Sequence, residues 1–412
     1  MQLRKHVTAL CVAVAALCFT AQAQEGAESV ILPSGGSADR SGNDKAPIQI
    51  DLAPDMITLQ KPIAVTVAAD NSPSQFKLVH SESAKSLAVH FNALNLLDGD
   101  QLVLRGVQNE NYTITQALTG GFWSRPIAGK YVIIELIPSK GVTADEHAKR
   151  GFSVSIDGYK YMTSAQNEEN CGSDDSQPAK CFMTTATKDV QAYLKAQAVA
   201  RVVINGSIPC SGAILGASGY FLTASHCIST PESAKEAIIE FGAESASCSD
   251  DSKIQLGSQG TDFLRNSELY AVNVELDYAI LKLDQSKNNV VSKYGFLKLR
   301  AAGATNGEEI FIAHHPNAYA KRVSMVNDNK SITAQTGLTA TACDGNVADQ
   351  VGYLADTVGG SSGAPVISST DFTVVSVHRC GGCTAVGSNS GLNARVISDD
   401  LKKQGKDLAE FY

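Results

Sequence analysis

The sequence predicts an all-β fold with one closing helix, and three observations support this. Short segments of alternating apolar and polar residues recur along most of the 412 residues, which is the pattern of half-buried strands. Clusters of Asp, Asn and Gly separate these segments and favour tight turns, and the chain holds 34 glycines. Near the C-terminus Ile397, Leu401 and Leu408 recur among charges, which predicts an amphipathic helix.

The beginning of the chain predicts a secreted, extracellular protein. Two basic residues precede an apolar run over 7–19 and small residues follow it, so residues 1–23 have the features of a signal peptide. The run is shorter than the about 20 apolar residues that a membrane-spanning helix needs. Residues 24–45 are rich in Gly, Ser, Ala and Asp, which predicts a flexible segment.

Residues 46–160 predict an N-terminal β domain, which we interpret as a small β-sandwich and a candidate propeptide. Strand patterns cover 87–91, 101–104 and 131–136. The single tryptophan, Trp123, is interpreted as a packing anchor of this domain. A sugar-binding role is the alternative, but a lone aromatic side chain is usually a packing residue.

A polar, turn-rich connection over 158–181 would suit proteolytic processing. The basic residues that we take as candidate cleavage points are Lys149, Arg150 and Lys160. Beyond it, residues 165–412 predict a second domain, in which a helical pattern over 188–200 leads into short strands that recur to about residue 377.

The cysteines indicate a disulfide-stabilised second domain. Two of the ten fall in the predicted signal peptide, and the other eight follow residue 170. An even number of cysteines in a secreted chain favours disulfides. Cys380 and Cys383 form a CxxC pair that a zinc or redox site could also use, but a structural zinc site needs a second pair or a Cys/His cluster, and the predicted mature sequence holds none.

Three short motifs carry the predicted chemistry. The first, FLTASHC over 221–227, places His226 at the end of an apolar strand. A lone histidine there would be structural, but a bridge between Cys227 and Cys210 would hold its loop against the neighbouring strand. A rigidly held imidazole is what a general base needs, since a misplacement of about 1 Å can cost on the order of a hundredfold in rate.

The second motif, LDYAILKL over 276–283, begins a strongly apolar strand with Asp277. A buried aspartate is costly unless it is paired. A histidine N–H is a suitable partner, because the carboxylate then holds the imidazole tautomer and stabilises the imidazolium. The alternative is a solvated aspartate at the edge of a strand.

The third motif, GGSSGAPV over 359–366, has glycines on both sides of Ser362 and predicts a tight turn that exposes one hydroxyl. The backbone N–H groups of Gly360 and Ser362 would form an oxyanion hole. A plain Gly/Ser loop is the alternative reading of this motif alone. The order His226, Asp277, Ser362 along the chain is that of chymotrypsin-type enzymes.

These motifs, together with AHHPN at 313–317 and VVSVHRCGG at 374–382, resemble a family. It comprises secreted trypsin-like serine endopeptidases related to bacterial lysyl endopeptidases, V8-like glutamyl endopeptidases and similar oomycete proteases. The resemblance covers roughly residues 165 to 400. It implies two antiparallel six-stranded barrels with a chymotrypsin-like active site between them, and the triad His226, Asp277 and Ser362.

The resemblance also suggests two disulfides, Cys210 with Cys227 and Cys181 with Cys248. The partners of the remaining four cysteines stay open. In mechanism, Ser362 would attack a peptide carbonyl while His226 takes its proton and Asp277 orients the imidazole.

Two residues compete as determinants of substrate preference. Asp356 lies six residues before Ser362, where trypsin places the acid that selects Lys or Arg, although a role in bonding the active-site loop is the favoured interpretation. His378 matches the position of a substrate-contacting histidine in glutamate-specific relatives. The segment SGLNAR over 390–395 lacks the acid that lysyl endopeptidases place there, which speaks against restriction to lysine.

We expect no cofactor and no metal site. His314 and His315 are adjacent, so on a strand they would face opposite sides. The net charge of −8 argues against nucleic acid as a partner, and we expect a monomer, without a membrane partner, that acts on protein or peptide substrates. The alternatives are a catalytically silent homologue that acts as a secreted binding or inhibitor protein, and an N-terminal domain that acts as a binding module.

Overall fold

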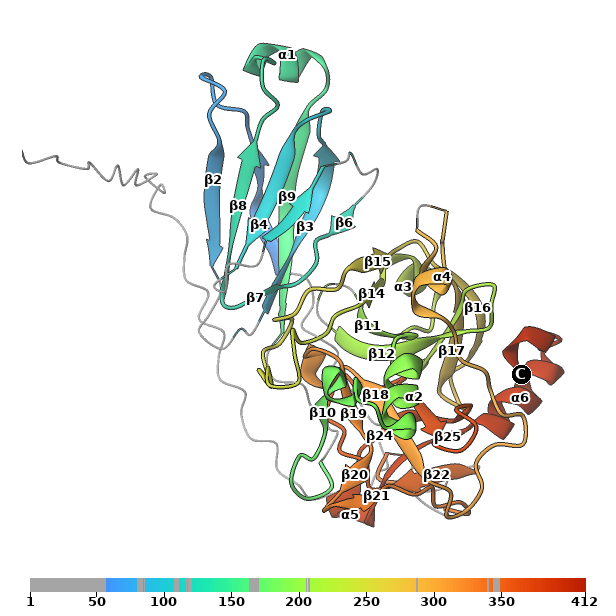
Figure 1. Ribbon diagram of the computed structural model, residues 1–412. Coiled ribbons are helices and arrows are strands. Elements are labelled where there is room, and N and C mark those ends of the chain that lie inside the picture. Colours follow the sequence, from blue (N-terminus) through green and yellow to red (C-terminus); the bar gives the residue numbers. More distant parts are fainter. Residues whose placement is uncertain are drawn as a thin grey trace, which may run out of the picture. The chain divides into compact units, whose positions relative to one another are not determined.

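The computed structural model describes residues 57–79, 84, 86–106, 111–115, 117, 121–162, 170–204, 206, 208–286, 288–338, 341–343 and 349–412. The predicted signal peptide and the flexible segment lie outside these residues. Two structural parts follow one another along the described chain, one over 57–162 and the other over 170–412 (Figure 1).

The first part consists of two antiparallel sheets that share one apolar core. One sheet has the order β1-β9-β3-β6, with β7 also paired to β3, and the other has the order β2-β8-β4-β5. The bounds are β1 Ile57–Val65, β2 Ser74–Val79, β3 Ser86–Asn95, β4 Gln101–Arg105, β5 Asn111–Ile114, β6 Phe122–Trp123, β7 Ile127–Ala128, β8 Tyr131–Ile137 and β9 Ser153–Met162. Phe91 of β3 and Ile134 of β8 are fully buried in the shared core. Two sheets over a common core are the arrangement of a sandwich.

Trp123 packs within this first part. Its side chain is buried, its ring lies 4.8 Å from that of His90 between centroids, and the Lys160 ammonium stands 5.0 Å from its ring. These are the contacts of a packing residue with a cation–π neighbour.

The polar connection is shorter than predicted, and the candidate cleavage points lie in ordered elements. β9 pairs with both β1 and β3, so Lys160 lies inside a sheet. Lys149 ends the helix α1 (Ala144–Lys149), and Arg150 forms its C-cap. Paired backbone is a poor protease substrate, because cleavage concentrates in exposed loops. This argues against cleavage at Lys160 in the folded chain, whereas Lys149 and Arg150 are exposed at the end of a helix. The processing site stays a prediction, and residues 163–169 are outside the described range.

The second part contains two seven-stranded antiparallel sheets, where we predicted two six-stranded barrels. The strand orders are β15-β14-β11-β12-β13-β17-β16 and β10-β19-β18-β23-β24-β25-β22. In the first sheet the bounds are β11 Val199–Ile204, β12 Ile208–Leu215, β13 Tyr220–Thr223, β14 Ile238–Phe241, β15 Asp262–Leu264, β16 Glu268–Asn273 and β17 Tyr278–Lys282. In the second they are β10 Gln177–Pro178, β18 Ile310–His314, β19 Arg322–Ser324, β22 Gln350–Tyr353, β23 Pro365–Ser368, β24 Val374–Cys380 and β25 Asn389–Asn393. The order of each sheet is open, and the two-residue β10 adds an edge strand that no sequence pattern indicated.

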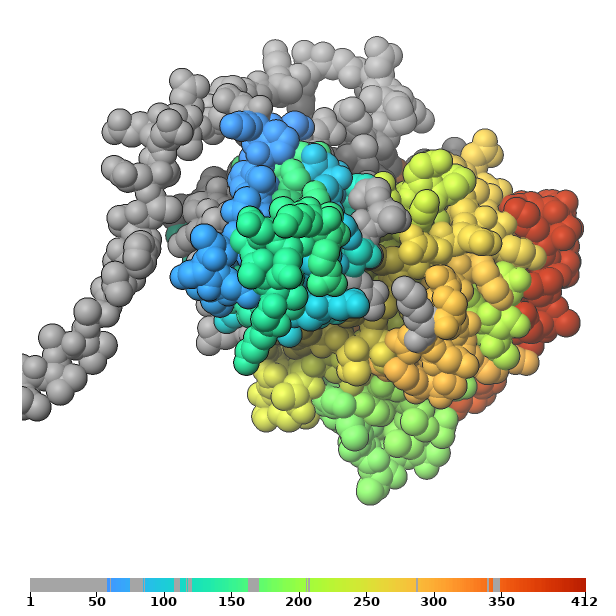
Figure 2. Space-filling view, turned by 90° about the horizontal axis from the view of Figure 1, so that it is seen from above, coloured from blue at the N-terminus to red at the C-terminus, as the bar shows by residue number. Residues whose placement is uncertain are grey.

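Short elements complete the described chain. A separate hairpin pairs β20 (Val326–Asn327) with β21 (Lys330–Ser331). The other helices are α2 Thr187–Ala196, α3 Pro231–Glu236, α4 Val290–Tyr294, α5 Cys383–Val386 and α6 Ala394–Lys403, with 3₁₀ helices η1 Ala179–Phe182, η2 Pro316–Ala318 and η3 Ala409–Phe411. The predicted C-terminal helix is α6, which lies at the molecular surface with the last residues in red (Figure 2). It ends at Lys403, so Leu408 lies beyond it, where it precedes η3.

One apolar core joins the two sheets of the second part. Ile214 of β12, Phe311 of β18 and Val377 of β24 belong to the same buried cluster. The helices α2 and α6 cover it, the latter through Leu401. No helix in the described ranges is long and apolar enough to cross a membrane.

Four disulfides link the eight cysteines after residue 170. Cys210 pairs with Cys227 and Cys181 with Cys248, as the family resemblance suggested. The two pairings that the sequence left open are Cys171 with Cys383 and Cys343 with Cys380. The CxxC cysteines are therefore bonded to different partners and not to each other.

Candidate active site

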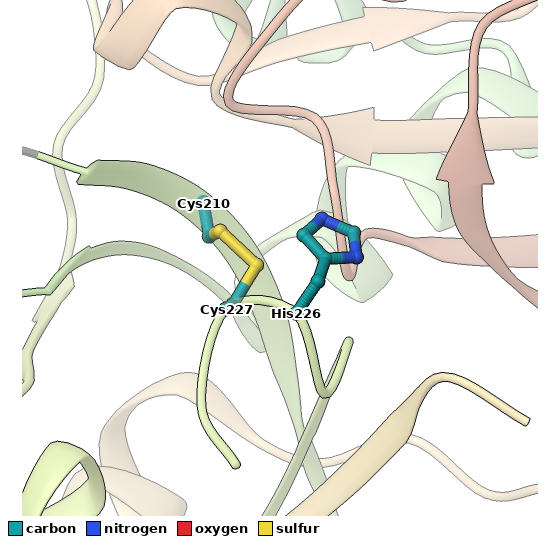
Figure 3. A group of neighbouring side chains, drawn as sticks. All are labelled: Cys210, His226 and Cys227. Carbon is teal, nitrogen blue, oxygen red and sulfur yellow. A yellow bond between two sulfur atoms is a disulfide. The ribbon is translucent and has the colours of Figure 1, made fainter. Parts of the chain in front are cut away.

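His226 lies in the loop that follows β13, beside a disulfide. Cys227 bonds Cys210 of β12, 17 residues earlier, and so ties this loop to the sheet (Figure 3). The side chain of His226 is 20% exposed, which leaves the imidazole accessible from one side. Within the described part of the chain Cys210, His226 and Cys227 form the one cluster of possible metal ligands, but disulfide sulfurs are not the thiolates that bind metals.

Asp277 stands where the turn from β16 enters β17. Its backbone has a left-handed φ of 63°, a conformation that non-glycine residues adopt at a cost. The Asn273 side chain accepts a hydrogen bond from Leu276 N and so supports the turn. The strained residue is thereby held with its carboxylate facing the His226 loop.

The Asp277 carboxylate accepts four hydrogen bonds. Oδ1 accepts from the Ser225 hydroxyl at 3.0 Å and from His226 N at 2.9 Å. Oδ2 lies 2.8 Å from His226 Nδ1 and 3.1 Å from Arg379 Nε. A carboxylate has about four lone-pair sites, so its hydrogen-bonding capacity is filled. Nδ1 of His226 therefore carries the proton, and Nε2 is the ring nitrogen without one.

The electrostatics of this group favour the ionised aspartate. Burial by itself raises the pKa of the Asp277 carboxyl, but the charge and hydrogen bonds of His226, with the charge of Arg379, outweigh it. The pKa of Asp277 therefore lies well below its ordinary value. Asp277 is therefore ionised near neutral pH.

Ser362 lies in a loop whose backbone is bonded at several points. The carbonyls of Gly359, Gly360 and Ser362 accept hydrogen bonds from Asn317 N, the Ser211 hydroxyl and Ser211 N. Gly360 has φ 101° and Gly363 has φ 83°, both in the region that favours glycine. The motif therefore needs its glycines for conformation.

Glycine at 360 is also required by close packing. A Cβ at this position would lie 2.8 Å from the carbonyl oxygen of His315 and 3.1 Å from Asn317 N. The backbone of the serine loop therefore touches the segment that follows β18. This contact fixes the direction of the Gly360 peptide, which is one of the two candidate oxyanion donors.

Asp356 is engaged by backbone amides. Its carboxylate accepts from Cys171 N at 2.8 Å and from Asp175 N at 2.7 Å, and the residue is 1% exposed. Burial raises the pKa of Asp356 to about 6, with the nearby charges of Asp174 and Asp175 adding to it and the two amides opposing it. Asp356 also lines a cavity of about 250 Å³ together with Asp174 and His314.

His378 is fully buried on β24. Its Nδ1 lies 2.7 Å from the hydroxyl of Tyr353, and its carbonyl accepts from Gly363 N at 2.8 Å. The backbone of His378 therefore contacts the serine loop, while its ring packs beside Tyr353 of β22. Of the two candidate specificity residues, His378 contacts the loop that carries Ser362, whereas the Asp356 carboxylate is bonded to Cys171 and Asp175.

His314 and His315 face different environments, as their adjacency predicted. Nδ1 of His314 lies 2.8 Å from the Ser361 hydroxyl, whereas Nδ1 of His315 lies 3.0 Å from the Tyr319 carbonyl. Both are fully buried, and burial lowers the pKa of His314 to about 3 and that of His315 well below its ordinary value. Both rings are neutral near pH 7.

Arg379 is the site residue that the sequence reasoning missed. It follows His378 directly on β24, and its guanidinium reaches Asp277 from the second sheet. The available signal was a basic residue inside a strand-like, mainly buried segment, but nothing in the sequence shows which acid it meets.

The paired histidine and aspartate, with a glycine-bounded serine loop on the neighbouring sheet, have the layout of a trypsin-like serine-protease fold. Residues 170–394 match the model of the family described as lysyl endopeptidase, C-terminal domain. The chain therefore belongs to this family.

Similarity to known proteins extends beyond the matched domain. The chain is 33% identical over 357 residues to secreted RxLR effector protein 73 of Plasmopara viticola, which covers 82% of this chain and 85% of that protein. Among solved structures, the inactive serine-to-alanine mutant of Rv3671c from M. tuberculosis H37Rv gives a TM-score of 0.39 at 14% identity, covering 57% of this chain and 96% of that one. Deg5 gives 0.37 at 15% identity, covering 52% and 91%.

Proposed function

We propose that this protein is a secreted serine endopeptidase with the catalytic triad His226, Asp277 and Ser362. The observation that carries the proposal is the Asp277 carboxylate, which accepts from both the backbone and Nδ1 of His226. This arrangement fixes the tautomer and the orientation of the imidazole, which is the function of the acid in a triad. We further propose that the two seven-stranded sheets are the two barrels of a chymotrypsin-like domain.

The proposed reaction runs through an acyl-enzyme. The Ser362 oxygen attacks the peptide carbonyl, its proton passes to Nε2 of His226, and the C–N bond breaks as that proton is given to the leaving amine. Water then attacks the acyl carbon and gives its proton to Nε2 of His226, and the ester bond to the Ser362 oxygen breaks as that oxygen takes the proton back. Gly360 N and Ser362 N would bind the oxyanion, and the bonded carbonyls of this loop support their fixed direction.

For substrate preference we propose that Asp356 has a structural function. Two backbone amides already occupy its carboxylate, so binding a Lys or Arg side chain there would have to displace them. The strand β25 carries no carboxylate, which argues against restriction to lysine in spite of the family name. His378 remains our proposed substrate-contacting residue, and a substrate side chain would have to reach it beside Tyr353.

We propose that residues 1–23 direct secretion and that the N-terminal β domain is a propeptide. The four disulfides support an oxidising compartment, and the relative from Plasmopara viticola is described as secreted. We expect protein or peptide substrates and a monomer.

A second candidate function follows from the name of that relative, an effector protein. In this alternative the chain is a silent protease homologue that binds another protein. The two functions differ in the reactivity of Ser362, because only an activated serine reacts with a fluorophosphonate.

The test compares the wild type with Ser362→Ala. We expect fluorophosphonate labelling and cleavage of a mixed peptide library by the wild type alone, with a loss of about a millionfold in turnover for the variant. Ser249→Ala, which changes an exposed serine, is the matched control and should behave as wild type. Absence of labelling in the secreted, processed wild type would favour the silent binding protein.

A further inference from the structure

Arg379 is aimed at Asp277 by an irregularity in β24. In the pairing of β24 with β25, His378 lies opposite Gly391 and Cys380 lies opposite Ser390. Arg379 is therefore the extra residue of a β-bulge, a device that turns a side chain away from the regular alternation. Its side chain is 9% exposed, and Nε lies 3.1 Å from Asp277 Oδ2.

The chain is held by two disulfides just beyond the bulge, on its C-terminal side. Cys380 is bonded to Cys343, and Cys383 is bonded to Cys171. The contact between the two sheets is thus made from a position with little freedom to move. A guanidinium is always protonated in proteins, so the contact supplies a permanent positive charge.

Arg379 and His226 use the same oxygen of Asp277. Oδ2 lies 2.8 Å from His226 Nδ1, and it also accepts from Arg379 Nε. One negative charge therefore faces one permanent cation and one ring that becomes a second cation when it takes up a proton. The second positive charge is less favourable than it would be beside an aspartate without an arginine.

We propose that Arg379 is a positioning residue that shares the Asp277 carboxylate with His226 and lowers the pH at which His226 becomes a neutral base. The catalytic consequence rests on the proposed function, whereas the electrostatic effect on His226 does not. The arrangement keeps the imidazole able to accept the Ser362 proton in mildly acidic surroundings. In exchange, the imidazolium that forms during the reaction is stabilised less.

Other groups near the pair are turned to partners of their own. Ser225, from the same loop as His226, is neutral and donates to Asp277. Tyr278, next to Asp277 on β17, has its hydroxyl 2.6 Å from the Asp400 carboxylate of α6. His378, beside Arg379 on β24, has Nδ1 2.7 Å from the Tyr353 hydroxyl. Arg379 is the charged group that contacts the shared carboxylate from the second sheet.

The direct test is the titration of His226 in the full chain. Histidine side chains labelled with ¹³C are followed by NMR in the Ser362→Ala background, with His226→Gln used to assign the signal. Arg379→Gln removes the charge and Arg379→Lys keeps it. We expect the midpoint of His226 to rise by about one pH unit with Gln and to stay near the wild-type value with Lys.

The second readout is the pH profile of kcat/KM in the background with Ser362 intact. Arg379→Gln should move the acidic limb of this profile to higher pH by the same shift. If Arg379 had a purely structural function, the variant would have a lower rate but the same limb position. A midpoint that is unchanged or lowered in Arg379→Gln overturns the proposal. If that variant does not fold, Arg379→Met gives the same comparison.

The two proposals fail separately. A protein without activity or fluorophosphonate labelling, whose His226 midpoint still rises in Arg379→Gln, contradicts the endopeptidase function and supports the effect of Arg379. An active enzyme in which the titration midpoint of His226 is the same with and without Arg379 supports the endopeptidase function and contradicts the effect of Arg379.

Discussion

The histidines of the two sheets of the second part differ in exposure and in charged neighbours. His226, on the first sheet, keeps a 20% exposed side chain and an aspartate within 2.8 Å. His314 and His315, at the end of β18 on the second sheet, are fully buried, and burial lowers the pKa of each. A histidine becomes a usable base only where a charge offsets its burial and one nitrogen can reach a substrate. The adjacent pair, which looks more conspicuous in the sequence, is instead part of the structural frame of the serine loop.

The largest effect on activity is expected when the carboxylate of Asp277, which is paired with His226, is replaced. Asp277→Asn keeps the shape but offers an N–H where Nδ1 needs an acceptor, so the tautomer of His226 inverts. We expect kcat to fall by about ten-thousandfold, as for the corresponding change in a known triad. Steady-state peptide cleavage measures this. Asp407→Asn, at an exposed aspartate, is the control and should retain full activity.

A second change tests how the buried histidines support the serine loop. Gly360→Ala adds a Cβ 2.8 Å from the His315 carbonyl, at a φ of 101°. The peptide that carries an oxyanion donor must then shift, so we expect turnover to fall by about a hundredfold to a thousandfold. Gly307→Ala has a similar φ of 80° but no atom within 4 Å of the added Cβ, so it reports backbone strain alone. Equal losses of activity in the two variants would contradict the proposed function of the contact.

A third prediction concerns acid stability. The folded protein leaves His314 and His315 neutral, whereas the unfolded chain protonates them below a pH of about 6.5. Stability should therefore fall as the pH falls from about 6 to 4, by about 1.4 kcal/mol per pH unit through His314, and His315 should add to this fall. His315→Gln should remove one such contribution. Urea unfolding at several pH values measures the slope, and an unchanged slope in the variant would speak against a neutral His315.

The smallest effect on stability is expected at Asp356. Its dependence on pH is opposite in sign to that of the two buried histidines. Because the pKa of Asp356 is raised to about 6, the folded protein retains this proton where the unfolded chain has released it. Asp356 thus adds stability at pH 4 that is lost as the pH rises to about 6. Asp356→Asn should make the fall in stability on acidification steeper, by up to about 1 kcal/mol per pH unit. The cleavage preference of the variant should stay that of the wild type, and loss of cleavage after Lys or Arg would instead assign Asp356 to substrate binding.

Much of the secondary structure follows from local patterns. The predicted strands over 87–91, 101–104 and 131–136 fall within β3, β4 and β8, and the helical pattern over 188–200 overlaps α2. Periods of two and of 3.6 residues record which face of an element is buried, so they can be read without knowing what covers it. The end of β9 was misjudged, because a polar, glycine-containing segment there pairs on both sides with other strands.

The three motifs and their order are readable in the amino-acid sequence, and they single out His226, Asp277 and Ser362. The folded chain was needed to reveal the partners of Cys171 and Cys343, the backbone amides that bond Asp356, and the contact of Arg379 with Asp277. These contacts join residues between 37 and 212 positions apart. The order of the strands and the bulge at Arg379 decide which distant segments come into contact. The pKa and the stability of a buried charged group then depend on the neighbours that these contacts supply.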